Sequence, residues 1–244
     1  MEWLTARAVA HRGLHDGGNI IENTASAFAA AIAGGYGIEC DLQISADGEA
    51  MVYHDEALGR LAEGSARLDA VTSAELKRTP FKAGIDRMIT LGDLCDLTAD
   101  RTPLIIELKS RYDGDRRLVR RAADVLSTYG GRAAVMSFDP LQMGMLREIT
   151  PGIVRGIVAE RAKRHYRRHG WFGAARRGTT YCERLVRMRP QFVAYAVDDL
   201  PAIMPSVARN VFQYPILAWT VRNPIQRERA RRYADQIIFE GFRP

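Results

Sequence analysis

Three carboxylates in this sequence could together hold a cation. Glu39 and Asp41 are separated by one residue near the end of a short apolar run, and Glu107 has the same place in a later run. If these runs are neighbouring strands, the three side chains share one side, where their charges repel unless a cation joins them. Because the ligands are all oxygen atoms, the set predicts a hard divalent cation, Mg²⁺ or Ca²⁺. Glu39 and Asp41 alone would be equally consistent with a salt bridge at the rim of a sheet.

Two histidines and two cationic side chains occur at matching positions. His11 and Arg12 end the first apolar run, His54 ends another, and Lys109 stands two residues after Glu107. Histidine exchanges protons near neutral pH, whereas Arg and Lys bind phosphate oxygens. Each residue alone has an ordinary structural explanation, as a hydrogen-bonded histidine or a Glu–Lys ion pair. Their combination with a metal indicates chemistry at phosphorus.

These side chains need a frame that brings several strand ends together. Eight short apolar runs are typical of strands buried on both faces of a parallel sheet: Ala6–His11, Gly37–Leu42, Leu104–Lys109, Ala133–Ser137, Ile153–Val158, Phe192–Val197, Ile216–Val221 and Gln236–Phe239. Amphipathic segments between them predict helices at Thr24–Ala33, Asp115–Tyr129, Pro140–Ile149, Leu200–Asn210 and Pro224–Tyr233. The alternation predicts a single α/β domain over residues 1–244, a TIM-like (β/α)8 barrel whose strand ends meet at one mouth.

A doubly wound open sheet is the alternative architecture. It would be expected to carry a glycine-rich phosphate loop after its first strand. The residues that follow His11 are Arg-Gly-Leu-His-Asp, which do not form such a loop, so the barrel is favoured.

Two stretches interrupt the alternation. Residues from about 45 to 88 are too many for one loop, and the run Ala50–Tyr53 within them predicts a small insertion after strand two. Residues from about 161 to 189 carry ten Lys or Arg and one acidic residue, so the chain's net charge of +6 is a local feature. We expect a solvated basic insertion there. Peripheral contact with an anionic membrane is the alternative, and a nucleic-acid surface is not favoured.

The composition favours a cytoplasmic protein with a large core. Hydrophobic residues make up 47% of the chain, yet none of its apolar runs approaches the roughly 20 residues that span a bilayer. The N-terminus lacks the pattern of a signal peptide. Cys40, Cys95 and Cys182 have no close pairing and no zinc-site spacing, which indicates reduced thiols.

Taken together, the motifs resemble the glycerophosphodiester phosphodiesterase family. The matching strings are Ala10-His11-Arg12-Gly13, Glu22-Asn23-Thr24, Gly37-Ile38-Glu39-Cys40-Asp41-Leu42, Asp47-Gly48, Val52-Tyr53-His54-Asp55, Leu104 to Lys109, Ser137-Phe138 and Trp219-Thr220-Val221. Their order and spacing match over roughly residues 8–140 and again near 215–223. No single string would be specific, but the combination is.

The resemblance implies metal-dependent hydrolysis of glycerophosphodiesters to glycerol 3-phosphate and an alcohol. The site residues it implies are Glu39, Asp41 and Glu107 for a divalent cation (Mg²⁺ or Ca²⁺), His11 and His54 for acid–base catalysis, and Arg12 and Lys109 for the phosphate. Trp219 is a further candidate for substrate contact, although packing is the more usual role of a tryptophan. Two alternatives stay open: an enzyme acting on lysophospholipids or phospholipids at a membrane, and a non-catalytic barrel that binds phosphodiesters or membranes.

The chain also departs from the family pattern. Ile21 stands where the family usually has Pro, and the loop before it adds His15, which we expect to be a loop residue without a catalytic role. The usual Thr-Asp pair after the last strand is replaced by Phe239-Glu240-Gly241. We expect this change to affect substrate contacts from the last strand and not the metal site.

Overall fold

Eight parallel strands close into a barrel in the computed structural model, which describes residues 1–161 and 188–244. The strands are β1 (Val9–Ala10), β2 (Gly37–Ile44), β4 (Leu104–Leu108), β5 (Ala133–Ser137), β6 (Val154–Ala159), β7 (Phe192–Ala196), β8 (Ile216–Val221) and β9 (Gln236–Phe239). They pair in chain order, and β1 pairs with both β2 and β9, which closes the ring. The predicted TIM-like barrel is therefore confirmed.

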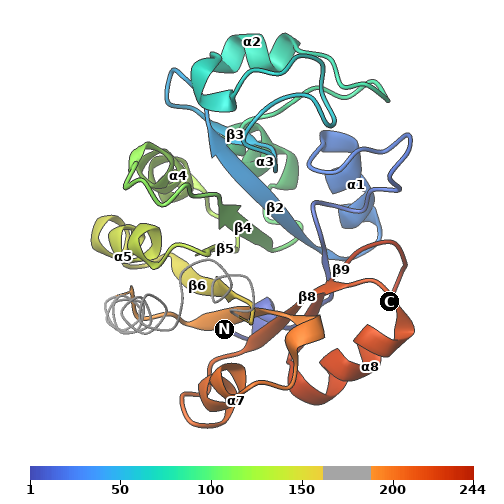
Figure 1. Cartoon of the computed structure of the whole chain (residues 1–244), viewed down its shortest axis with the longest axis vertical. Helices are drawn as coiled ribbons and strands as arrows, with labels where there is room; N and C mark the ends of the chain where they lie inside the picture. Colours follow the sequence, from blue (N-terminus) through green and yellow to red (C-terminus); the bar gives the residue numbers. More distant parts are fainter. Residues whose placement is uncertain (162–187) are drawn as a thin grey trace, which may run out of the picture.

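Helices lie outside this ring (Figure 1). They are α1 (Ala25–Ala33), α3 (Leu91–Thr98), α4 (Arg117–Thr128), α5 (Pro140–Ile149), α7 (Ile203–Asn210) and α8 (Pro224–Tyr233). Two 3-10 turns complete the elements: η3 (Val197–Asp199) follows β7, and η1 (Glu2–Leu4) packs Leu4 on the core inside the barrel. Side-chain caps define several helix starts; Thr24, for example, accepts a hydrogen bond from the Ala27 amide at the start of α1. Within the described residues, no helix is long and apolar enough to cross a bilayer.

The alternation of side chains along the strands divides the core in two. One set, which includes Ile38, Cys40 and Leu42 of β2, belongs to the large cluster between the strands and the helices. The other set fills the inside of the barrel and includes Ile105 and Phe192. Because side chains alternate along a strand, Glu39 and Asp41, which stand between these outward-facing residues, must face the interior.

The stretch between β2 and α3 forms the predicted small insertion. It contains β3 (Ala50–Val52), which runs antiparallel to β2, followed by η2 (Leu68–Ala70) and α2 (Ser73–Arg78). It buries a small core together with Ile21 of the loop before α1; the insertion contributes Met51, Tyr53, Ala62, Leu68, Leu76, Phe81 and Met88. The predicted basic insertion at about 161–189 lies outside the described residues except for its ends.

Individual boundaries differ from the prediction in a few places. The strand predicted at Ala6–His11 shrinks to Val9–Ala10, and α3 was not predicted. Cys40 and Cys95 are buried free thiols, whereas Cys182 lies outside the described residues.

Candidate active site

The three predicted carboxylates meet inside the mouth of the barrel. Glu39 and Asp41 project from β2 and Glu107 from β4, and Asp41 is the direct neighbour of Glu107 in the strand register. All three side chains are buried, and one oxygen atom from each lies within 4.8 Å of the others. Side chains alternate along a strand, so Glu39 and Asp41 face inward where their neighbours Ile38 and Cys40 face outward. Glu107 faces inward beside Asp41, and the three carboxylates therefore converge.

Two cations lie against this cluster. Lys109 Nζ is 2.8 Å from Asp41 Oδ1 and 2.7 Å from Glu107 Oε1. Arg12 Nε is 3.1 Å from Asp41 Oδ2, and the Arg12 amide donates to Glu39 Oε2 at 2.9 Å. Three carboxylates thus share two positive side chains, so the cluster is short of positive charge.

A tight turn after β1 makes the contact with the Arg12 amide possible. Arg12 and Gly13 have φ angles of 58° and 81°, in the left-handed region. A Cβ at Gly13 would lie only 2.8 Å from the backbone carbon of Ala27 in α1, so the turn also needs glycine for close packing.

Burial and neighbouring charges shift the pKa values of the three acids in different directions. Burial, together with Asp41 and Glu107, raises the pKa of Glu39 well above its usual value. Burial also raises the pKa of Glu107, although Lys109 opposes the shift. For Asp41 burial acts in the same direction, but Lys109 and Arg12 outweigh it and lower the pKa. A hard divalent cation fits this site, because it would supply the missing charge and all the donors are oxygen atoms.

His54 stands at the same mouth, at the end of the β3 segment. Its Nδ1 is 2.7 Å from Asp55 Oδ1, and Asp55 Oδ2 is 2.6 Å from Arg60 Nε. Arg60 also binds Glu22, whose Oε1 is 2.7 Å from Arg12 NH1. A chain of ion pairs therefore links His54 to Arg12. The pairing of Asp55, Arg60 and Glu22 in this chain was not predicted from the sequence.

His11 has an equivalent carboxylate partner, Glu240, which was not predicted from the sequence. Its Nδ1 is 2.9 Å from Glu240 Oε2, and its Nε2 is 4.0 Å from Glu39 Oε2. The hydrogen bond with His11 lowers the pKa of Glu240 to about 2. Two signals could have identified Glu240. It stands two residues after Ile238, which faces the inside of the barrel, so its side chain should point the same way. In addition, β9 must lie beside β1 in a closed barrel.

Trp219 and Phe138 form an aromatic wall at the mouth. Their rings meet edge to face with centroids 5.6 Å apart, and both pack on the core inside the barrel. The indole Nε1 of Trp219 is buried without a hydrogen-bond partner within the described chain. Phe138 also lines a cleft of about 320 Å³ that includes His54, Glu107, Lys109 and Tyr112. A buried donor without a protein partner is suited to an oxygen atom of water or of a bound molecule.

A sequence model described as the glycerophosphoryl diester phosphodiesterase family matches residues 11–239. The chain belongs to this family. The predicted resemblance is thereby confirmed, and the match extends over the segment 141–214, where no motif had been recognised.

Curated relatives named for this activity are about 30% identical to this chain over the aligned region. A glycerophosphodiester phosphodiesterase of Caldanaerobacter subterraneus subsp. tengcongensis is 30% identical over 164 residues, which are 62% of this chain and 65% of the relative. One of Bacillus altitudinis is 31% identical over 161 residues, or 61% and 64% of the two chains. The aligned region is thus less than two thirds of each relative's length.

Solved structures of the family have the same fold over almost the whole chain. A phosphodiesterase of Oleispira antarctica, solved with sn-glycerol 3-phosphate, has a TM-score of 0.77 at 19% identity and covers 96% of this chain and 92% of its own. A glycerophosphodiester phosphodiesterase of Thermotoga maritima has a TM-score of 0.72 at 25% identity, with 96% and 94% covered.

Proposed function

We propose that this protein hydrolyses glycerophosphodiesters to glycerol 3-phosphate and an alcohol, using a divalent cation held by Glu39, Asp41 and Glu107. The observation that carries the proposal is the convergence of these acids with His11 and His54 at one barrel mouth. Family membership supports it, as do the relatives named for this activity and the product complex of the Oleispira antarctica protein. Mg²⁺ and Ca²⁺ both suit an oxygen-only set.

Arg12 and Lys109 are the proposed phosphate ligands. When bound, the cation would polarise the phosphate oxygens and so favour attack at phosphorus. Arg12 and Lys109 already contact Asp41 from two sides, which holds their charged ends where a phosphate beside the acids would need them. Trp219 Nε1 is a candidate donor to the same substrate.

His11 and His54 are the proposed acid–base pair. In the first step a hydroxyl of the glycerol attacks phosphorus and gives its proton to His11 Nε2, while the departing alcohol takes a proton from His54. The bond from phosphorus to the alcohol oxygen breaks, and a cyclic phosphate forms. In the second step water attacks phosphorus, His54 takes its proton, and His11 returns a proton to the glycerol oxygen as the ring opens.

Release of glycerol 3-phosphate from a panel of glycerophosphodiesters and lysophospholipids tests this proposal. We expect turnover of several water-soluble diesters with added Mg²⁺ or Ca²⁺, and its loss with EDTA. No release from any diester with either metal would contradict the proposal. Tight binding of a diester without turnover would instead favour the non-catalytic alternative.

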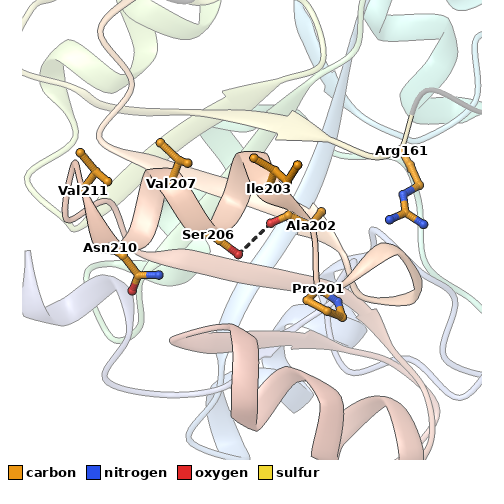
Figure 2. A pocket seen from close by; sticks show the side chains of 8 residues that line it. All are labelled: Arg161, Pro201, Ala202, Ile203, Ser206, Val207, Asn210 and Val211. Atoms are coloured by element: carbon orange, nitrogen blue, oxygen red, sulfur yellow. Dashed lines mark hydrogen bonds between the residues drawn. The ribbon is translucent and has the colours of Figure 1, made fainter.

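A specific observation favours peripheral membrane contact as a second property. An open groove of about 560 Å³ runs along α7, where Ile203, Val207 and Val211 present apolar side chains to solvent (Figure 2). Ile203 is 85% exposed. Arg161 lines the same groove and begins the segment 161–189, whose sequence is strongly basic. Apolar and basic groups together are what an anionic lipid surface binds.

Replacing Arg164, Arg167 and Arg168 together by Glu is expected to weaken binding to anionic vesicles. The change reverses three charges, and each basic residue near such a surface contributes about 1 kcal/mol. Co-sedimentation with phosphatidylglycerol vesicles measures the effect, with phosphatidylcholine vesicles as the control. Unaltered binding to the anionic vesicles would rule out this surface. Hydrolysis of a water-soluble diester should stay at the level of the unmodified protein, because none of the three residues belongs to the proposed catalytic site.

A further inference from the structure

Glu240 connects three strand ends at the barrel mouth. Its Oε2 is 2.9 Å from His11 Nδ1 and 2.8 Å from an NH2 atom of Arg222, which follows β8. The backbone fixes this position, because the Glu240 amide donates to Val221 at 3.0 Å and the His11 amide donates to Phe239 at 2.9 Å. The carboxylate thus reaches His11 from a rigid neighbouring strand.

The contact defines which ring nitrogen of His11 carries the proton. A carboxylate accepts hydrogen bonds and does not donate them, so Nδ1 must be the protonated atom. Nε2 then keeps a free lone pair and lies 4.0 Å from Glu39 Oε2, on the side of the carboxylate cluster. The His11 side chain is only 12% exposed, which leaves water little access as a substitute partner.

We propose that Glu240 is a positioning residue, which holds His11 in the tautomer whose Nε2 can accept the substrate's proton. The inference rests on the acid–base role proposed for His11. Once His11 has taken that proton, the Glu240 carboxylate also stabilises the positive ring.

The second histidine has a parallel arrangement. His54 Nδ1 is 2.7 Å from Asp55, and Asp55 is 2.6 Å from Arg60, just as His11 binds Glu240 and Glu240 binds Arg222. Both proposed acid–base groups therefore have a carboxylate on Nδ1 and an arginine behind that carboxylate. Because the same arrangement occurs at both proposed proton-transferring histidines, it supports a role of Glu240 in setting the His11 tautomer. A chance ion pair at the surface would not be expected to occur at both.

Glu240→Leu and Glu240→Gln separate this role from a structural one. Leucine keeps the bulk but removes the acceptor, so kcat should fall at least about tenfold with KM unchanged. Glutamine keeps an oxygen acceptor without the charge, so its kcat should lie between those of the leucine variant and the unmodified protein. Glu228→Leu is the matched control, because Glu228 lies on α8 and binds Arg231 and Arg232 away from the mouth. Its kcat should not change.

Long-range ¹H–¹⁵N NMR of the His11 ring gives a readout that does not depend on turnover. In the metal-free protein at about pH 8, where histidine is neutral, we expect a protonated Nδ1. In Glu240→Leu the proton should move to Nε2, and in Glu240→Gln it should stay on Nδ1. A leucine variant with unmodified kcat, a loss confined to KM, or a proton still on Nδ1 would overturn the proposal. If the unmodified protein hydrolyses no diester, the proposed function fails, and the NMR comparison still decides whether Glu240 sets the tautomer.

Discussion

His54→Ala is expected to lower glycerophosphodiester hydrolysis by roughly 100- to 10,000-fold, the usual contribution of a positioned acid–base group. The fold should survive, because the His54 side chain is 32% exposed and its side-chain partner is the partly exposed Asp55. Release of glycerol 3-phosphate measures the loss, and thermal unfolding verifies the fold. A variant that turned over the diester at the unmodified rate would contradict the mechanism.

His15→Ala is the matched control for this experiment. It makes the same chemical change in the loop after β1, and we expect activity to be retained because His15 is not assigned to proton transfer.

The leaving group distinguishes the acid from the base. An aryl alcohol such as p-nitrophenol departs without protonation, whereas choline needs a proton. If His54 is the acid of the first step, His54→Ala should lose less activity with the aryl ester than with the choline ester. His11→Ala should lose similar activity with both. The opposite pattern would exchange the two roles.

The sequence was sufficient to predict the barrel and the face of the strand on which Glu39 and Asp41 lie. Strands buried on both faces give continuous apolar runs, and β5, β8 and β9 have the predicted bounds. The inward direction of Glu39 and Asp41 follows from the period of two along a strand. α3 was missed although Thr90 and Asp93 form a capping box at its start, because the helix is only eight residues long and directly follows the insertion.

The partners of the two histidines could not be predicted in the same way. Glu240 is 229 positions from His11 in the chain, and the pair exists only because β9 closes against β1. Arg60 binds Glu22 because the insertion folds against the loop after β1, at a separation of 38 residues. Strand periodicity fixes which face a residue is on, but such contacts depend on the three-dimensional closure of the chain.

Glu39→Gln is expected to abolish hydrolysis and yet stabilise the metal-free protein. The buried Glu39 accepts a hydrogen bond from the Arg12 amide, and a glutamine oxygen can still accept it. What glutamine removes is a negative charge next to Asp41 and Glu107, which raise the pKa of Glu39 together with burial. The same change removes a proposed metal ligand, so the variant should lose the stabilisation that bound metal gives.

The sign of the pH dependence follows from the direction of that pKa shift. The folded-state pKa of Glu39 lies above its ordinary value of 4.5, so its contribution to stability is complete below that value and is lost as the pH rises through the folded pKa. Glutamine does not titrate. The advantage of Glu39→Gln in EDTA should therefore grow as the pH rises from about 5 towards the folded pKa, by about 1.4 kcal/mol per unit of pKa difference. Thermal unfolding in EDTA and in excess Mg²⁺ or Ca²⁺ measures it.

Asp41→Asn is the control with the opposite sign. Lys109 and Arg12 outweigh burial and hold the pKa of Asp41 below its ordinary value of 3.8, so its ionised form stabilises the fold above that value and loses this effect only as the pH falls through the folded pKa. Asparagine should thus destabilise the metal-free protein already at about pH 5, because it leaves two partly buried cations, Arg12 and Lys109, short of a partner. Both variants should lose the thermal shift caused by metal. If Glu39→Gln instead destabilised the protein in EDTA, and metal shifted neither the unmodified protein nor the variants, the three acids would be a structural ion-pair cluster and not a cation site.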